Sequence, residues 1–360
     1  MSDTTENGAD RTPHLTIESR RIGLDQPTYV IAELSANHNQ SFEAAVELVH
    51  IAKDVGADAI KLQTYTPDTI TLNVDSPIFR VGGGTLWEGR LLYELYGEAY
   101  TPWSWQPKLK ALADEIGIHM FSSAFDATAI DFLEGIGMPA HKVASFELVD
   151  LPLIERMART GKPLIMSTGM ATLEEIEDAV NAARKAGARQ IALLKCTSAY
   201  PAPPEEVNLR TICDLAERFG VVAGLSDHTL GISVPVAAVA LGARIVEKHF
   251  TKSRAVKGPD SAFSLEPEEF RAMVLAIRTT EKALGTVRYG AEAREAQSRQ
   301  FRRSLFVVQN VKAGEPFTEA NVRSIRPGNG MPPKHMGHVL TKRAAVDLDR
   351  GTPLRWDMLA

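Results

Sequence analysis

The chain has 360 residues with a formal net charge of −5, and 44% of its residues are hydrophobic and 24% charged. These values are ordinary for a globular protein and give no reason to expect nucleic-acid binding, and no apolar run of about 18 residues predicts a transmembrane helix. The polar N-terminus lacks the apolar region of a secretory signal, and two cysteines make no disulfide framework. We therefore expect a cytoplasmic protein with a disordered tail over residues 1–14.

Eight short apolar segments recur between residues 28 and 250, and most are continuous apolar runs, as expected for strands buried on both faces. They are Tyr29–Leu34, Ala59–Tyr65, His119–Phe125, His141–Phe146, Pro163–Gly169, Ile191–Thr197, Val221–Asp227 and Arg244–Phe250. Helical patterns separate most of them, with Ser41 as a helix cap and Thr172 with Glu175 as a capping box. The alternation predicts the α/β class and a (β/α)₈ TIM barrel over residues 15–285, with a doubly wound open sheet as the alternative.

A histidine lies at the carboxyl end of each of the last two segments: His228 directly follows Val221–Asp227, and His249 is the second-last residue of Arg244–Phe250. A small-residue helical segment, 234–241, lies between them, so the three form a strand–helix–strand unit with parallel strands. Both imidazoles then reach the same edge of the sheet, beside the carboxylates Asp227 and Glu247. This arrangement suits a divalent metal ion. The alternative is that two unrelated histidines stand at loop mouths.

All eight predicted strands end in polar residues, and closure of a barrel brings these ends into one pocket. They are Glu33, Lys61, Gln63, Ser122, Ser123, Lys142, Ser145, Glu147, Ser167, Thr168, Lys195, Thr197, Ser198, Ser226, Asp227, His228, Glu247 and His249. Clustered lysines and hydroxyls suit an anion, most often a phosphate. A single rim lysine is equally compatible with a surface salt bridge. We interpret Cys196, which lies among these residues, as a small buried apolar side chain.

Two further regions depart from the strand and helix alternation. Residues 66–101 form an insertion rich in aromatic residues, which suits a substrate lid, with a packed surface excursion as the alternative. After a last barrel helix near residues 266–284, residues 286–300 have no strong periodicity and predict a linker. Short β-like runs and turn signals then predict a small β-rich domain over residues 301–360.

Several motifs along residues 30–330 resemble, in order, those of the sialic acid synthase family, the phosphoenolpyruvate (PEP)-dependent nonulosonic acid synthases. They are IAELSANHN, KLQTYTPDT, KVASFE, STGMATLEEI, LKCTSAYP, GLSDHT, EKHFT, GPD and RPGNG. The C-terminal 60 residues resemble the family's antifreeze-like (SAF) domain. Within the family, GTLWEG and LYELYGEAYTPW resemble the branch that makes pseudaminic acid, and Ser198 stands where sialic acid synthases usually carry asparagine.

The resemblance implies a condensation of PEP with an amino sugar, here 2,4-diacetamido-2,4,6-trideoxy-altrose. The net charge and the lack of long basic or apolar runs predict no nucleic-acid or membrane partner. It implies Glu33 as the acid/base residue and His228 and His249 as catalytic ligands of Mn²⁺ or Mg²⁺. The implied PEP contacts are Ser123, Lys142, Ser145, Ser167, Ser198 and Ser226. The implied sugar contacts are Lys61, Gln63, Glu147, Tyr200, Asp260 and Arg326. Arg326 corresponds to an arginine that the SAF domain delivers to the partner subunit, which implies a domain-swapped homodimer.

Three alternatives remain open at the level of the sequence. An N-acetylneuraminic or legionaminic acid synthase of the same family uses the same motifs on another sugar. A Schiff-base aldolase or lyase on the same barrel would use Lys195 as its nucleophile. A carbohydrate-binding or scaffold protein would explain the aromatic insertion, but it leaves the convergent lysines, serines and histidines without a role.

Overall fold

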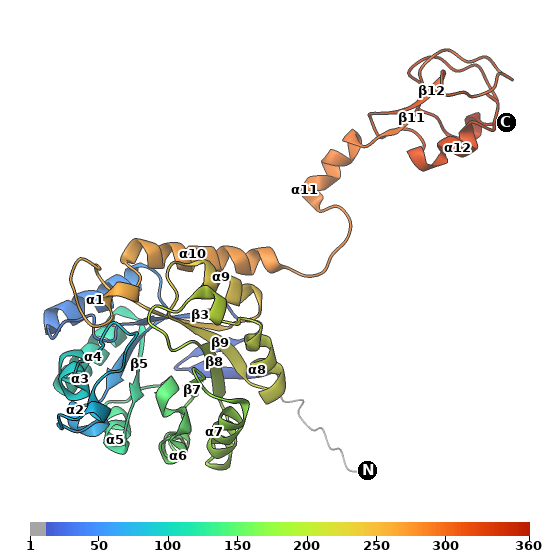
Figure 1. Ribbon diagram of the computed structural model, residues 1–360. Helices are drawn as coiled ribbons and strands as arrows, with labels where there is room; N and C mark the ends of the chain where they lie inside the picture. The colour runs from blue at the N-terminus through green and yellow to red at the C-terminus, as the bar shows by residue number, and fades with distance from the viewer. Residues whose placement is uncertain (1–11) are drawn as a thin grey trace, which may run out of the picture. The chain divides into compact units, whose positions relative to one another are not determined.

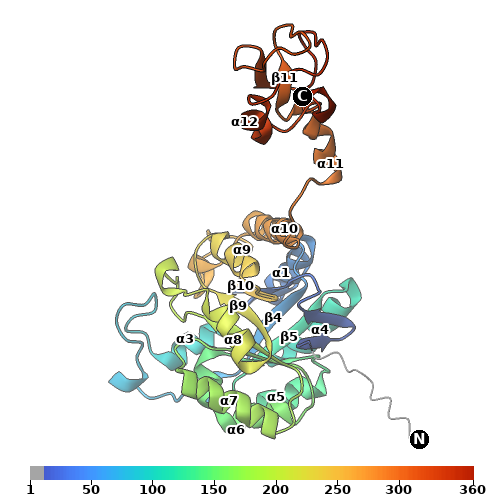
Figure 2. The same ribbon diagram turned by 90° about the vertical axis from the view of Figure 1, so that its right-hand side faces the viewer.

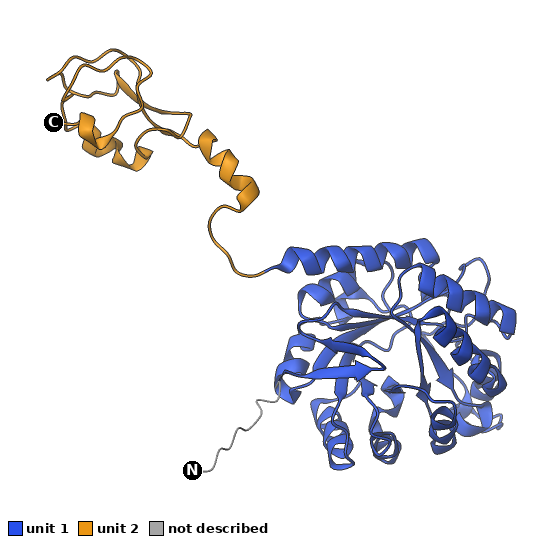
Figure 3. Ribbon diagram, turned by 180° about the vertical axis from the view of Figure 1, so that it is seen from behind, with its two compact units in different colours: residues 1–285 blue, residues 286–360 orange. Residues whose placement is uncertain are grey.

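The computed structural model describes residues 12–360 and contains two compact units, one ending at Gly285 and the other spanning Thr286–Ala360 (Figure 3). Most of the predicted tail, residues 1–11, lies outside the described residues, and strand β1 begins at His14. Within residues 12–360, no helix combines the length and the apolar character that a membrane crossing requires.

Eight parallel strands form a closed barrel in the first unit (Figure 1). They are β3 (Tyr29–Glu33), β4 (Ala59–Thr64), β5 (His119–Ala124), β6 (His141–Val143), β7 (Leu164–Ser167), β8 (Ile191–Cys196), β9 (Val222–Asp227) and β10 (Ile245–His249). Strand β10 pairs with β3, and His249 lies opposite Glu33 in the register. The predicted (β/α)₈ barrel is therefore confirmed, and the open-sheet alternative is wrong.

Helices surround the barrel and bury their apolar faces against it. The main ones are α1 (Phe42–Asp54), α4 (Gln106–Ile116), α5 (Ala127–Gly135), α6 (Leu151–Ala158), α7 (Leu173–Lys185), α8 (Thr211–Phe219), α9 (Ser233–Ala240) and α10 (Pro267–Leu284). The predicted caps are present: the Ser41 side chain accepts a hydrogen bond from the backbone of Ala44, and Thr172 forms a capping box with Glu175. These local signals place the first residues of α1 and α7 where the sequence predicts them.

An N-terminal hairpin that the sequence analysis did not predict closes the amino end of the barrel. It consists of β1 (His14–Ile17) and β2 (Arg20–Gly23), which pair in antiparallel fashion. The hairpin places fully buried Leu15, Ile17 and Ile22 in one apolar cluster with inward-facing residues of the barrel strands. The amino end of the barrel is thus filled by side chains, and the polar strand ends lie at the opposite, carboxyl end.

The insertion after β4 consists of short elements joined by turns, and its helix α3 is labelled in Figure 2. They are α2 (Pro67–Ile70), the 3₁₀ helix η1 (Pro77–Phe79), α3 (Leu92–Ala99) and the 3₁₀ helix η2 (Trp103–Trp105). Arg80 and Leu91 form an antiparallel bridge, so the residues between them make a small hairpin. Three further 3₁₀ helices follow barrel strands: η3 (Ser145–Val149), η4 (Pro204–Glu206) and η5 (Ser261–Phe263).

The second unit has its own apolar core, which includes Leu305, Val307 and Phe317. Its elements are α11 (Ala293–Ala296), η6 (Gln297–Phe301), β11 (Ser304–Val307), β12 (Val322–Ile325), η7 (Pro333–His335), α12 (Met336–Val339) and η8 (Trp356–Met358). Strands β11 and β12 pair in antiparallel fashion, and isolated bridges extend the pairing. The expected linker, residues 286–300, holds α11 and most of η6 rather than irregular chain throughout.

Candidate active site

The carboxyl ends of the barrel strands surround one polar cavity, and every barrel strand contributes at least one lining residue. The lining residues are Glu33, Lys61, Gln63, Ser123, Lys142, Ala144, Ser145, Ser167, Cys196, Tyr200, Ser226, His228, Glu247 and His249. The structure thus brings together most of the residues that the sequence analysis singled out. Of the residues that the resemblance implies as acid/base, metal, PEP or sugar contacts, four do not line the cavity: Ser198, Glu147, Asp260 and Arg326.

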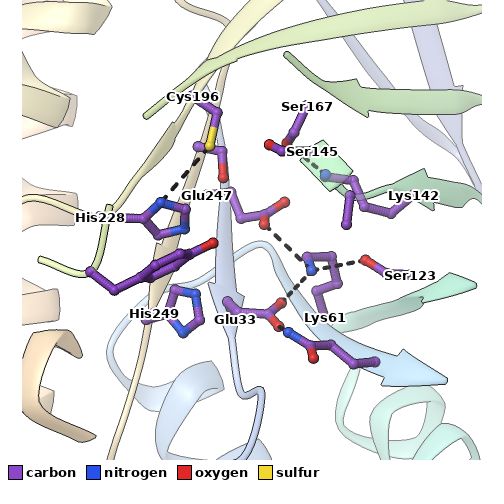
Figure 4. A pocket seen from close by; sticks show the side chains of 14 residues that line it. Glu33, Lys61, Ser123, Lys142, Ser145, Ser167, Cys196, His228, Glu247 and His249 are labelled. Atoms are coloured by element: carbon purple, nitrogen blue, oxygen red, sulfur yellow. Dashed lines mark hydrogen bonds and ion pairs between the residues drawn. The ribbon is translucent and has the colours of Figure 1, made fainter. Parts of the chain in front are cut away.

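A buried lysine between two carboxylates forms the centre of the cavity (Figure 4). Lys61 Nζ lies 2.6 Å from Glu33 Oε2 and 3.4 Å from Glu247 Oε1, and it donates a hydrogen bond to Ser123 Oγ. Burial raises the pKa of Glu33 to about 7, against the opposing effect of Lys61. Burial also opposes charge on Glu247, but Lys61, Lys142 and His228 together hold its pKa below the ordinary value. The two carboxylates therefore differ in protonation near neutral pH.

Lys142 and a group of serines form one side of the cavity. Lys142, only 1% exposed, donates from Nζ to Ser167 Oγ at 2.6 Å and to a backbone carbonyl at 2.8 Å. Burial lowers its pKa. A glycine that the sequence analysis did not single out holds this side together: Gly169 N donates to Ser145 Oγ at 3.2 Å, and a Cβ on Gly169 would overlap Ser198 Oγ. Although Ser198 does not line the cavity, it adjoins the same glycine.

The two histidines form the opposite side, with Glu247 between them and Lys142 (Figure 4). Their ring centroids are 5.3 Å apart. His228 uses Nδ1 for a contact with the carbonyl of Thr197 at 2.9 Å, which leaves its Nε2 for another partner. Burial, followed by the positive charge of His228 and Lys61, lowers the pKa of His249 well below its usual value, so this imidazole is neutral.

This donor set fits a divalent ion. A metal ligand must be a neutral imidazole nitrogen or a carboxylate, and His249 Nδ1 and Glu247 Oε2 are both buried without a hydrogen-bond partner among the described residues. Residues 12–360 contain no cluster of three or more His, Cys, Asp or Glu side chains arranged to hold a metal. Two imidazoles alone would leave most coordination positions to water and substrate, as in catalytic rather than structural sites.

Cys196 is buried as expected, but its surroundings are polar. Its Sγ lies 3.8 Å from His228 Nδ1 and it lines the cavity. Burial alone would raise the pKa of the thiol, but His228, Ser145 and Lys142 together lower it to about 7. The interpretation as a plain apolar residue is therefore incomplete. The sequence signal for this was available, because Cys196 directly precedes the strand-end residues that were singled out.

The residues implied as sugar contacts occupy different positions around the cavity. Tyr200 packs on His228, with ring centroids 4.3 Å apart. Asp260 accepts hydrogen bonds from Ser35 Oγ and, at 3.4 Å, from the backbone of Ala36. Glu147 is largely buried with one oxygen unpartnered among the described residues, and burial raises its pKa to about 7.

The side chains of Lys195 and Arg326, which the sequence analysis also considered, do not line the cavity. Lys195 donates from Nζ to the carbonyl of Cys196 at 2.7 Å and does not line the cavity. Arg326 belongs to the second unit, where it is exposed just after strand β12.

Comparisons with known proteins agree over nearly the whole chain. The NeuB family model matches residues 48–289, and the SAF domain model matches residues 302–360. A pseudaminic acid synthase of Helicobacter pylori is 45% identical, covering 92% of this chain and 98% of its own length. An N,N'-diacetyllegionaminic acid synthase of Legionella pneumophila is 34% identical, covering 93% and 95%.

A solved structure gives the same result. The crystal structure of an N-acetylneuraminic acid synthetase from Leptospira borgpetersenii, in complex with citrate, superposes with a TM-score of 0.71 at 30% identity and covers 80% of this chain and 95% of that chain. The matched barrel, the strand-end motifs and the extent of these similarities lead to one conclusion. The chain belongs to the NeuB family and carries a SAF domain at its C-terminal end.

Proposed function

We propose that the protein is a pseudaminic acid synthase, which condenses PEP with 2,4-diacetamido-2,4,6-trideoxy-altrose and water to give pseudaminic acid and phosphate. The observation that carries this proposal is one cavity in which Lys142 and its serines face the histidine pair across Glu247. An anion cradle and an electrophile-activating site in one pocket suit the joining of PEP to a carbonyl. The 45% identity to a pseudaminic acid synthase over nearly the full length of both chains supports the choice of sugar.

The lysine and serine side of the cavity would bind PEP. PEP carries a phosphate dianion and a carboxylate, which require cations and aligned donors. Lys142 offers its ammonium group, and Ser123, Ser145, Ser167, Ser198 and Ser226 offer hydroxyl groups in the same region. Because Lys142 is almost completely buried and already bonded to Ser167, its charge is pre-positioned rather than recruited on binding.

The histidine side would receive the carbonyl end of the open-chain sugar. A divalent ion held by His228 and His249 would supply Lewis acidity to the sugar aldehyde, and we propose Mn²⁺ or Mg²⁺ for this role. Lys61, Gln63, Glu147, Tyr200 and Asp260 would hold the sugar. The C3 carbon of PEP then forms a bond to the aldehyde carbon, water adds at C2, and the C2–O bond to phosphate breaks.

Glu33 would move the protons of this reaction. It lies opposite His249 in the strand register, and its raised pKa of about 7 allows it to exchange a proton near neutral pH. As a general base, it would take the proton of the water that adds at C2. Gln63 Nε2 donates to Glu33 Oε1 at 3.0 Å and orients the carboxylate.

We also propose that the active unit is a homodimer in which Arg326 of one subunit completes the pocket of the other. Arg326 is exposed and makes no ion pair with the residues that the structure describes. A guanidinium can bind two oxygens at once, so it adds specificity for an acetamido carbonyl or a pair of sugar oxygens that a lysine does not provide.

Turnover on a panel of synthetic amino sugars tests the proposed activity. Purified protein is incubated with PEP, a divalent ion and one sugar, and mass spectrometry identifies the nonulosonic acid while a colorimetric assay follows phosphate release. We expect strong preference for the diacetamido trideoxy-altrose over N-acetylmannosamine and over the legionaminic acid precursor. Equal or faster turnover of either other sugar would contradict the proposed substrate while leaving PEP condensation in place. Absence of phosphate release with every sugar would contradict the condensation itself.

A further inference from the structure

The insertion after β4 contacts residues around the active site through the side chain of Trp87. Its hairpin is closed by hydrogen bonds from Val81 N to Arg90 O and from Gly89 N to Val81 O, both 2.9 Å long. Side chains add to this closure, because Arg80 donates to the carbonyl of Gly89 at 2.9 Å. Trp87 therefore lies in a turn with defined backbone geometry, not in a loose excursion.

The indole of Trp87 makes two kinds of contact with residues that follow other strands. The centroid of its ring lies 5.6 Å from the ring centroid of Tyr200 and 6.4 Å from that of Phe263. Its Nε1 donates a hydrogen bond to the carbonyl of Pro259 at 3.1 Å. One side chain thus touches the segment after β8 and the segment after β10.

Two of these contacts lead to residues proposed to hold the sugar, Tyr200 and Asp260, and the third leads through Phe263 to His249. Tyr200 packs on His228 and also lies 5.2 Å from Phe263, which in turn lies 4.9 Å from His249. The aromatic cluster of Trp87, Tyr200 and Phe263 therefore backs the histidine pair. Aromatic contacts of this kind prefer tilted and edge-on geometries and restrict the rings that make them.

The hydrogen bond from Trp87 Nε1 to the carbonyl of Pro259 holds the segment after β10 that carries Asp260. Pro259 directly precedes Asp260, whose carboxylate accepts from Ser35 Oγ. Ser35 in turn accepts from Gln63 Nε2 at 3.1 Å, and Gln63 donates to Glu33. A chain of polar contacts thus connects the backbone that Trp87 holds to the proposed proton-transfer residue.

We propose that Trp87 is a positioning residue for the sugar. By binding Tyr200 through its ring and the Pro259 carbonyl through its N–H, it sets the distance between two sugar-contacting walls, and so it makes the insertion a determinant of sugar selectivity. Trp87 does not line the cavity itself, so it acts through Tyr200 and Asp260. This inference rests on the proposed condensation of PEP with a sugar. Among residues 12–360, Trp87 makes no ring contact or hydrogen bond with Lys142 or the serines, so we expect PEP binding not to depend on it.

Steady-state kinetics of Trp87→Ala and Trp87→Phe test the proposal, with Leu86→Ala as the matched control. Leu86 is the neighbouring residue of the same hairpin and is 53% exposed. Loss of both the ring contacts and the hydrogen bond in Trp87→Ala is expected to raise KM for the sugar about tenfold or more. KM for PEP should stay within about twofold, and selectivity over N-acetylmannosamine should fall. Trp87→Phe keeps a ring but loses the N–H donor, so its KM for the sugar should lie between those of wild type and Trp87→Ala.

The outcomes separate this inference from the proposed function. Wild-type protein that fails to release phosphate with any sugar contradicts the proposed function before any variant is measured. With an active wild type, an unchanged KM for the sugar in Trp87→Ala overturns the positioning role. An equal rise of KM for PEP and sugar, or the same change in Leu86→Ala, also overturns it, because either result indicates general damage to the hairpin or barrel.

Discussion

Gly169 has no side chain, and this leaves room for the hydroxyl groups of Ser145 and Ser198. A Cβ at this position would overlap Ser198 Oγ and would lie 2.7 Å from Ser145 Oγ. Gly169→Ala should therefore push both hydroxyls out of the anion cradle and raise KM for PEP by about tenfold, the cost of one to two weakened hydrogen bonds to a charged group. Gly135→Ala, in the last turn of helix α5, where no atom lies within 4 Å of a new Cβ and φ is not positive, serves as a control for PEP binding. An unchanged KM for PEP in Gly169→Ala would contradict the cradle.

The raised pKa of Glu33 predicts a pH dependence of turnover. A general base works only when deprotonated, so kcat should rise as the pH rises through about 7, the pKa to which burial raises this carboxyl group. Glu33→Gln keeps the shape and the hydrogen bond to Gln63 but cannot accept a proton. We expect it to bind PEP normally, to lose kcat by about 10²-fold or more, and to lose this limb of the pH profile.

Glu147 provides the control for this assignment, because burial also raises its pKa to about 7. Glu147→Gln should keep the limb that Glu33→Gln removes. If the limb instead disappears in Glu147→Gln, the titrating group is misassigned. If Glu33→Gln changes only KM for the sugar, Glu33 orients the sugar and does not transfer protons.

The histidine pair predicts a binding site that can be measured without turnover. His249→Ala removes one of the two imidazoles of the pair, so Mn²⁺ affinity, followed by electron paramagnetic resonance of free Mn²⁺, should fall about tenfold or more. His50→Ala, an exposed histidine on helix α1, should bind Mn²⁺ as wild type does. Treatment with EDTA should abolish turnover, and Mn²⁺ or Mg²⁺ should restore it. Unchanged Mn²⁺ affinity in His249→Ala would contradict the metal site.

At the scale of elements, a buried ion pair joins the two strands that carry the histidines. Lys248 bonds to Asp227, and both side chains are almost fully buried, at 0% and 1% exposure. The two residues are register partners of β10 and β9, and each directly precedes one of the histidines. Asp227 also accepts from the backbone and hydroxyl of Thr229 at 3.0 and 3.1 Å. The pair therefore fixes the two strand ends beneath the histidine pair.

Removal of one partner should destabilise the barrel strongly. Lys248→Met leaves the Asp227 carboxylate buried without its cation, which costs about 3–5 kcal/mol in the free energy of unfolding. The double variant Asp227→Asn with Lys248→Met removes the charge and should recover much of that loss. Urea unfolding followed by near-ultraviolet circular dichroism measures both. If Lys248→Met lowers the free energy of unfolding by less than about 1 kcal/mol, the pair stabilises the barrel no more than a surface salt bridge does. That result would contradict its structural role.

At the scale of the whole molecule, complementation between inactive subunits tests the proposed exchange of Arg326. His228→Ala and Arg326→Ala proteins are each expected to be inactive. If the arginine acts in the partner's pocket, a mixed dimer has one pocket with both defects and one with neither, so activity should reappear after subunits exchange. If the arginine acts within its own chain, every pocket keeps one defect and the mixture stays inactive.

Two measurements make this result decisive. Native mass spectrometry verifies that mixed dimers form, because each variant has a distinct mass. Mixing each variant with itself under the same conditions gives the baseline activity. Verified exchange without recovered activity would contradict the domain-swapped homodimer.

Local sequence signals were enough to predict the barrel and most of the cavity wall. Apolar runs at strand spacing, helix caps such as Ser41 and the Thr172 capping box are local signals, and each begins or ends an element independently of the rest of the fold. Once eight strands close, the polar residues at their carboxyl ends gather around one pocket, although not all of them line it. For this reason Glu33, Lys142 and His249 were identifiable from their positions at strand ends.

Contacts between residues distant in the chain could be seen only in the folded structure. The contact of Trp87 with Tyr200 and Pro259 depends on how an aperiodic insertion folds over two other segments, and no local pattern encodes that approach. The crowding around Gly169 likewise arises only when the segments that carry Ser145, Gly169 and Ser198 pack together. The same holds for the lowered pKa of Cys196, which depends on His228, just after β9, and on Lys142 of β6. Periodicity predicts which face of an element is buried, whereas the distances that set selectivity and protonation arise only when separate elements pack together.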